Sequence, residues 1–136
     1  MSDMSDMFAY LEQLEKEVDS TTFSTPSAIE SKSKSDGYIR HLLQKTSEFE
    51  VYCIVWSAGA ETPFHGHPDG GCWMRVIAGQ LHEVTMGGER ILRVGDTGFQ
   101  KGPYGIHKIW ALEASRSLHL YKPGRVFSGE PVFLPT

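Results

Sequence analysis

The chain has 136 residues, of which 40% are hydrophobic and 22% charged, as is typical of a folded globular domain. Its net charge of −4 provides no basic field, which argues against nucleic acid as a partner. No apolar run is long enough to span a membrane, and the acidic N-terminus lacks the features of a secretion signal. With only Cys53 and Cys72 present, we expect no disulfide framework and a location in the reducing cytoplasm.

The first segment predicts an amphipathic helix over 4–18, because its apolar residues recur at spacings of three and four. These residues are Met4, Met7, Phe8, Leu11, Leu14 and Val18. Residues 20–36 are rich in Ser and Thr and include Pro26, so we predict a connector there. One helical turn is expected within it, over 26–30.

After Gly37 the sequence changes to short aromatic and β-branched stretches separated by glycine turns. We predict strands over 38–43, 49–57, 73–77, 81–86, 90–94, 106–112 and 117–121. Short strands at near-regular spacing favour an antiparallel sandwich or a small barrel. We therefore expect one mainly β domain over 1–136, with a helix and connector over 1–37 and a β-barrel over 38–136.

Two histidines alternate within the segment from Gly59 to Gly79. Residues two apart in an extended strand point to the same face, so His65 and His67 can converge on one metal ion. A third ligand must come from elsewhere, and the candidates are His41, His82, His107 and His119. The alternative is a pair of ordinary polar side chains at a barrel mouth, and a three-His site also suits zinc.

The spacing Gly59-x5-His65-x-His67-x4-Cys72-x6-Gly79 resembles the first cupin motif, with Cys72 where many cupins carry glutamate. Pro103-x-Gly105-x-His107 resembles a shortened second motif. Five stretches, in order, resemble the cysteine dioxygenases, the thiol-oxidising branch of the cupins. They are Tyr38-Ile-Arg40, Trp56, His65-x-His67-x4-Cys72, Gly105-Ile-His107-Lys and Ser117-Leu-His119-Leu-Tyr121.

The resemblance implies a cupin (jelly-roll-like) small β-barrel with a short N-terminal helical segment. It also implies a non-haem iron(II) enzyme that oxidises L-cysteine with O₂ to cysteine sulfinic acid. Its implied Fe(2+) ligands are His65, His67 and His107. Its implied substrate-binding residues are Tyr38, Arg40 and Trp56, and its implied thioether pair is Cys72 and Tyr121.

The residues themselves are suited to this chemistry. Arg40 can bind a carboxylate through two parallel hydrogen bonds, and it shares a strand face with Tyr38. Ser117, His119 and Tyr121 alternate on one face, so a hydrogen-bonded line can lead to the Tyr121 hydroxyl as a catalytic group. Cys72 also suits a small buried position in the core.

Three alternatives stay open at this point. The substrate can be another small thiol, such as 3-mercaptopropionate. The chain can be a non-catalytic metal-binding cupin, or a zinc or nickel isomerase or hydratase. In each case we expect small-molecule partners, which for the leading hypothesis are the thiol and O₂, and a monomer.

Overall fold

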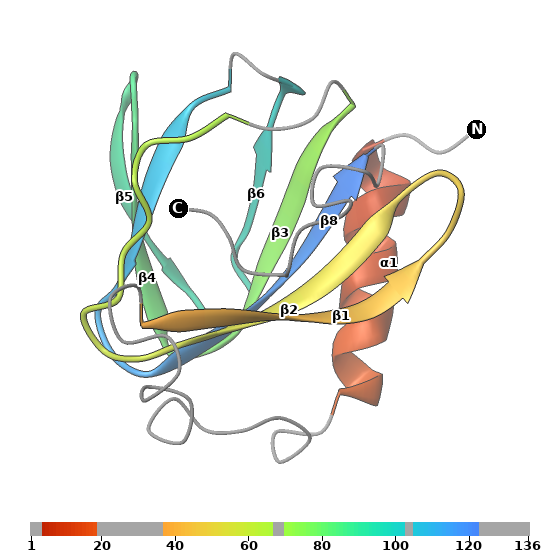
Figure 1. Cartoon of the computed structure of the whole chain (residues 1–136), viewed down its shortest axis with the longest axis horizontal. Coiled ribbons are helices and arrows are strands. Elements are labelled where there is room, and N and C mark those ends of the chain that lie inside the picture. Colours follow the sequence, from red (N-terminus) through yellow and green to blue (C-terminus); the bar gives the residue numbers. More distant parts are fainter. Residues whose placement is uncertain (1–3, 19–36, 67–69, 103–104, 123–136) are drawn as a thin grey trace.

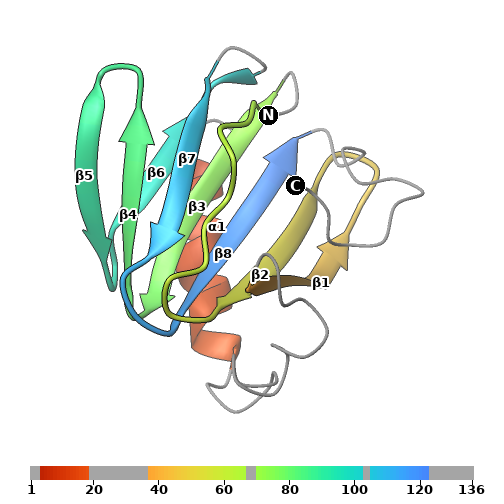
Figure 2. The ribbon, with the colours of Figure 1, turned by 60° about the vertical axis from the view of Figure 1, so that its left-hand side comes forward.

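The structure is a computed structural model, and it describes residues 4–18, 37–66, 70–102 and 105–122 (Figure 1). Within this part, strands form two antiparallel sheets that face each other (Figure 2). The larger sheet contains β1 (Tyr38–Lys45), β2 (Glu50–Trp56), β8 (Ser115–Lys122), β3 (Gly71–Ala78) and β6 (Thr97–Gln100), in that order. The smaller sheet contains β5 (Gly88–Arg93), β4 (Gln80–Thr85) and β7 (His107–Ala111).

The predicted helix is confirmed as α1 (Met4–Glu17), which lies along the outer face of the larger sheet (Figure 1). Its apolar side packs through Met7 and Leu11 onto outward-facing residues of β2, β3 and β8. Arg75 on β3 also donates to Glu15 of the helix across 2.6 Å. No helix in the described part of the chain is long and apolar enough to cross a membrane.

The main core lies between the two sheets. It is formed mostly by alternate residues of the facing strands: Tyr38, Ile54, Trp56, Met74, Val76, Leu81, Leu92, Ile109 and Ala111. Every residue of β2 is buried, because one face of this strand meets this core and the other meets the layer under α1. This double burial explains why β2 reads as a nearly continuous apolar run.

The predicted fold class is confirmed, and the seven predicted strands are all present with shifted ends. An eighth strand, β6, was missed because it has only four residues and contains Gly98, which usually marks a turn. It pairs with β3 at one edge of the larger sheet. The predicted connector over 20–36 and its helical turn lie outside the described residues.

The chain between β2 and β3 runs beside β7 and extends the smaller sheet. Thr62 N donates to Ile109 O across 2.8 Å, and His65 and His107 exchange backbone hydrogen bonds of 3.0 and 3.1 Å. His65 therefore belongs to an isolated bridge with His107 rather than to a full strand. This pairing places the two motif histidines directly opposite each other.

Candidate metal centre and substrate pocket

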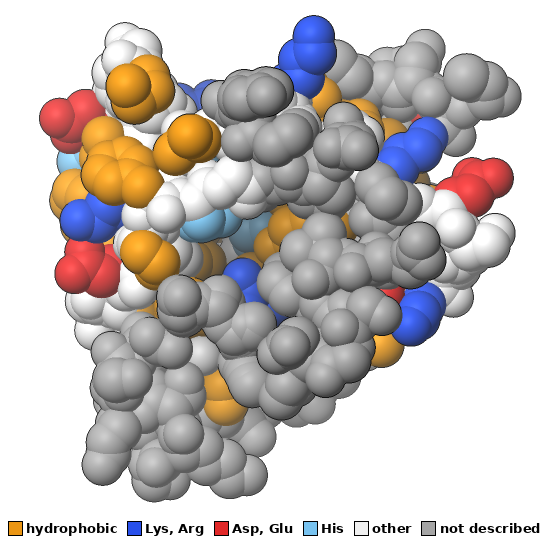
Figure 3. All heavy atoms as spheres, turned by 45° about the horizontal axis from the view of Figure 1, so that its top comes forward, with side chains coloured by type: hydrophobic (Ala, Val, Ile, Leu, Met, Phe, Trp, Pro, Cys, Tyr) orange, Lys and Arg blue, Asp and Glu red, His pale blue; other side chains and the backbone are white. Residues whose placement is uncertain are grey.

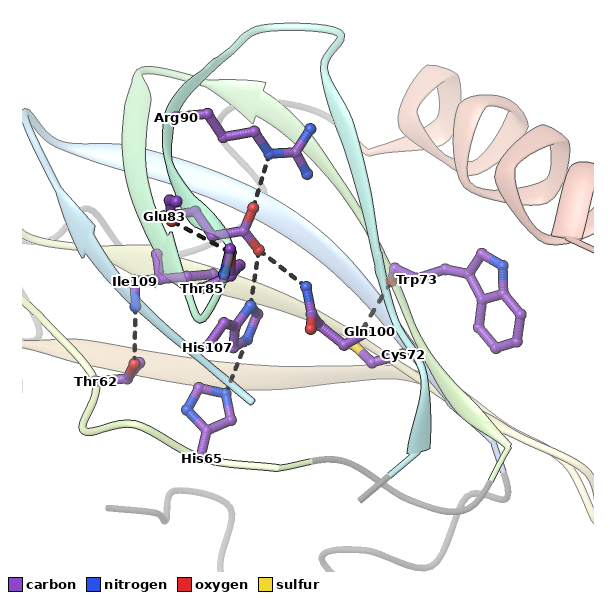
Figure 4. Close-up of polar contacts among 12 residues, drawn as sticks. Thr62, His65, Cys72, Trp73, Glu83, Thr85, Arg90, Gln100, His107 and Ile109 are labelled. Carbon is purple, nitrogen blue, oxygen red and sulfur yellow. Dashed lines mark hydrogen bonds and ion pairs between the residues drawn. The ribbon is translucent and has the colours of Figure 1, made fainter. Parts of the chain in front are cut away.

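The side chains of His65 and His107 point at each other. Their Nε2 atoms are 3.1 Å apart and their ring centroids 4.6 Å apart (Figure 4). Each opposite ring nitrogen has its own acceptor: His65 Nδ1 lies 2.9 Å from Pro63 O, and His107 Nδ1 lies 2.8 Å from Glu83 Oε2. A carbonyl or carboxylate oxygen can only accept, so each histidine carries its proton on Nδ1.

The Nε2 atoms of the two rings therefore face each other across 3.1 Å. Two facing nitrogen acceptors at this distance need a proton or a metal ion between them. With metal–nitrogen bonds of about 2.1 Å, two nitrogen atoms bound to one ion are roughly 3.0–3.4 Å apart. The spacing and the tautomers of this pair therefore fit a shared metal ion.

The third predicted ligand, His67, lies outside the described residues. Among the residues that the structure describes, no three His, Cys, Asp or Glu side chains gather as a metal site. Of the alternative third ligands, His82 lies on the outer face of the smaller sheet, where it contacts Glu89 at 2.7 Å and stacks on Trp110. The chain thus brings His107, and not His82, to His65.

Electrostatics keep this pair suited to a cation. Burial and, to a smaller extent, the neighbouring His107 lower the pKa of His65 to about 4, so the ring is neutral at physiological pH. Burial alone would raise the pKa of Glu83, but hydrogen bonds from His107 and Arg90 outweigh it and bring it to about 2. The ionised carboxylate of Glu83 thus contacts Nδ1 of His107, on the opposite side of the ring from the Nε2 atom that faces His65.

A narrow pocket lies beside the histidine pair, with a cavity volume of about 10 Å³. Both sheets contribute to its wall, which includes Tyr38, Arg40, His65, His107, His119 and Tyr121. Figure 3 shows histidine and Lys or Arg side chains within a depression on one face of the molecule. The structure therefore brings two predicted metal ligands together with the predicted substrate-binding residues.

Arg40 is the cation of this pocket, although only 6% of its surface is exposed. It lies over the Tyr38 ring at 5.7 Å and is hydrogen-bonded to Tyr121. A guanidinium held this far from water interacts strongly with an anion, because little solvent screens the pair. The site can thus bind a small carboxylate close to the facing histidines.

Cys72 and Tyr121 are direct cross-strand partners on β3 and β8, and both are buried. Their side chains are hydrogen-bonded and form a small cluster with Tyr52. Burial raises the pKa of the Cys72 thiol and of the Tyr121 phenol, so both are neutral at physiological pH. The adjacency that a thioether bond requires is therefore present between these two side chains.

Ser117 links Trp56 to His119. Trp56 Nε1 donates to Ser117 Oγ across 2.9 Å, and Ser117 Oγ lies 2.7 Å from His119 Nε2. The indole can only donate, so Ser117 Oγ accepts from Trp56 and its own hydroxyl proton is available for His119 Nε2. The predicted line from Ser117 to His119 is present, and the His119 ring then stacks against Tyr121 with centroids 6.2 Å apart.

Sequence reasoning missed Glu83, which hydrogen-bonds to His107 from the neighbouring strand β4. The available signal was weak: a glutamate in the alternating stretch Gln80–Thr85, where an acidic residue normally marks the solvent face. Only the register of β4 against β7 shows that Glu83 faces inward while His82 faces outward.

The two facing sheets, with paired histidines at the open end, define a cupin, and solved structures agree. KdgF from Halomonas sp. superposes with a TM-score of 0.61 and 25% identity, covering 65% of this chain and 82% of that one. An RmlC-like cupin from Shewanella frigidimarina has a TM-score of 0.61 and 24% identity, covering 67% of this chain and 80% of its own.

The chain belongs to the cysteine dioxygenase type I family, whose model matches residues 13–126. Cysteine dioxygenase type 1 of Bos taurus is 28% identical in an alignment 102 residues long that covers 63% of this chain and 51% of the bovine protein. The Homo sapiens protein is 26% identical with the same coverage. The chain thus spans about half the length of these curated relatives.

Proposed function

We propose that this chain is a non-haem iron(II) thiol dioxygenase that converts L-cysteine and O₂ to cysteine sulfinic acid. One observation carries the proposal: two imidazoles whose Nε2 atoms face each other across 3.1 Å share a pocket with a buried guanidinium. The first feature suits a metal ion and the second a carboxylate substrate. Membership of the cysteine dioxygenase type I family supports the same chemistry.

The proposed iron ligands are His65, His67 and His107. Three neutral imidazoles leave the positive charge of iron(II) uncompensated, so the site favours an anionic ligand such as a thiolate. Iron would bind and activate the thiol and O₂ together. The overall reaction, R–SH + O₂ → R–SO₂H, places both oxygen atoms on sulfur and needs no other reductant.

Arg40 is proposed to hold the substrate carboxylate, with Tyr38 beside its guanidinium. The ring of Trp56 packs against Tyr38 at 4.9 Å and supports this wall of the pocket. A carboxylate fixed at Arg40 limits where the thiol end of a short molecule can reach. The substrate sulfur is thereby directed to the metal position that His65 and His107 are proposed to form.

The groups on β8 are proposed to handle protons near the reacting sulfur. Ser117 orients His119, and Tyr121 offers a neutral hydroxyl that Arg40 also contacts. Cys72 and Tyr121 are proposed to join by a thioether bond, with O₂ as oxidant and loss of two hydrogen atoms. Intact mass before and after turnover detects that loss, and an unchanged mass would contradict the bond.

The same pocket suits 3-mercaptopropionate, which also carries a thiol and a carboxylate. Cysteine is preferred because its amine can occupy a further metal position beside the sulfur. We also propose that the protein acts as a monomer in the reducing cytoplasm, in keeping with the free thiols of Cys53 and Cys72.

An oxygen electrode tests the proposal on protein loaded with Fe(II) under anaerobic conditions. We expect O₂ uptake with L-cysteine, slower uptake with 3-mercaptopropionate, and none with cysteamine, which lacks the carboxylate. Uptake with cysteamine equal to that with cysteine would contradict the role of Arg40. Iron-loaded protein that consumes no O₂ with any thiol would support a non-catalytic cupin instead.

A further inference from the structure

Glu83 is a buried carboxylate that the proposed reaction leaves unused. Only 1% of its surface is exposed, and it accepts hydrogen bonds from three side chains on three other strands. The donors are His107 Nδ1 at 2.8 Å, Arg90 Nε at 2.8 Å and Gln100 Nε2 at 3.3 Å (Figure 4). Burying an ionised carboxylate is costly unless such partners compensate it. These three donors therefore compensate the buried charge of Glu83 and hold its carboxylate in one position.

Arg90 reaches this carboxylate because Gly98 leaves room for it. A Cβ added at Gly98 would lie 2.8 Å from Arg90 Nη2, closer than side-chain atoms normally approach. The guanidinium contacts Glu83 Oε1, while Oε2 remains for His107 and Gln100. Each oxygen thus has its own donors, and the carboxylate plane is held relative to the imidazole.

This fixed carboxylate determines which nitrogen of His107 faces His65. With the proton of His107 held on Nδ1, its Nε2 lone pair points across the 3.1 Å gap. A carboxylate on the far nitrogen also makes an imidazole a stronger ligand for a metal. The usual two-His, one-carboxylate iron site places a negative charge on the metal itself. In this chain the carboxylate of Glu83 contacts the imidazole of His107 and not the proposed metal position.

We propose that Glu83, held by Arg90 and Gln100, is the positioning residue that fixes the tautomer and orientation of His107 for metal binding. This inference rests on the proposed function, because it takes His107 as a metal ligand. Glu83 acts through His107 and does not itself touch the substrate.

The test uses Glu83→Gln, which keeps the shape of the side chain but removes its charge. In this variant the new amide oxygen can accept from His107 Nδ1. The amide NH₂ group then faces the N–H of Arg90, and two donors repel each other. We therefore expect a mixture of His107 tautomers in ¹⁵N NMR of the metal-free protein, against one Nδ1–H form in wild type. Fe(II) affinity, measured by competition with a coloured chelator, should fall about 10- to 100-fold.

The matched control is Glu89→Gln, on the same hairpin. Glu89 also contacts a histidine, His82, at 2.7 Å, but this pair lies on the outer face of the sheet. The control should keep wild-type Fe(II) affinity. Should Glu83→Gln fail to fold, Arg90→Gln serves instead, because half of the Arg90 side chain is exposed and its loss frees the carboxylate to rotate.

Unchanged Fe(II) affinity and an unchanged His107 tautomer in these variants would overturn the inference while leaving the proposed function intact. Conversely, wild-type protein that binds no Fe(II) would contradict the proposed function. In that case the tautomer of metal-free His107 still decides the role of Glu83, since a single Nδ1–H form in Glu83→Gln would show that the carboxylate does not set it.

Discussion

The two sheets of the barrel contribute different chemistry to the same pocket. The smaller sheet, with the segment that pairs with it, presents His65, His107 and the carboxylate of Glu83. The larger sheet presents a single guanidinium, Arg40, among neutral side chains such as Trp56, Ser117 and Tyr121. One wall is thus suited to a cation and the other to an anion.

This difference separates metal binding from substrate binding. The imidazoles of His65 and His107 each contact an acceptor through Nδ1, so their Nε2 atoms face each other beside the pocket. Among the residues that line the pocket, Arg40 is the charged group that the larger sheet contributes. Substitutions on the two walls are therefore expected to fail in different ways, and the predictions below run from the largest effect to the smallest.

Removing a proposed metal ligand gives the largest effect. His107→Ala should abolish both Fe(II) binding and cysteine-dependent O₂ uptake, with an affinity loss beyond the roughly 100-fold expected for an outer partner. Chelator competition and an oxygen electrode measure the two losses on the same sample. His82→Ala, on the outer face of the same sheet, is the control and should retain both. Wild-type iron content in His107→Ala would contradict the assignment.

Removing the guanidinium should spare the metal. Arg40→Gln is expected to bind Fe(II) like wild type but to raise KM for L-cysteine about 10- to 100-fold, the worth of a charge-assisted hydrogen bond pair. Steady-state O₂ uptake measures KM, and the exposed Arg93→Gln on β5 is the control. If KM is unchanged, the larger sheet does not bind the carboxylate through Arg40.

Breaking the line from Trp56 to His119 should have a smaller effect. Ser117→Ala leaves the buried indole N–H without its acceptor, at a cost of about 1–3 kcal/mol in unfolding free energy. We expect kcat to fall more than KM rises, with Fe(II) affinity unchanged. Equal kinetics in wild type and Ser117→Ala would show that this line is structural only.

The smallest effect concerns the outer face of the larger sheet, which lies away from the pocket. Burial raises the pKa of Cys53 from 9.0 to about 12. The unfolded thiol ionises near its ordinary value and the folded thiol does not, so wild type should lose stability as pH rises from about 9 to 12. Cys53→Ala should lose less over that interval, as urea unfolding at neutral and alkaline pH can show. Parallel pH profiles for the two proteins would contradict the burial effect.

The sequence predicted the fold and most of the pocket because their signals are local. Glycine-separated β-branched stretches mark the strands, and alternation places Ser117, His119 and Tyr121 on one face. Residue spacing left four histidines open as the third ligand, and the resemblance to the cupin motifs selected His107, which the structure places opposite His65. These features depend on neighbouring residues, which a single sequence displays directly.

What the sequence did not reveal depends on register between distant strands. Glu83 and His82 are adjacent polar residues, and either could face the core until β4 is paired with β7. The strand β6 is short and is defined by its pairing with β3 rather than by its own composition. Gln100 on that strand and Arg90 on β5 reach Glu83 only after both pairings form.

The most direct test of this account is the product formed from L-cysteine under ¹⁸O₂ by Fe(II)-loaded protein, with Arg40→Gln and His107→Ala run in parallel. We predict cysteine sulfinic acid carrying both labelled oxygen atoms from wild type, little of it from Arg40→Gln despite bound iron, and none from His107→Ala. Product with one labelled atom, or cystine alone, would contradict the assignment of this pocket to a thiol dioxygenase.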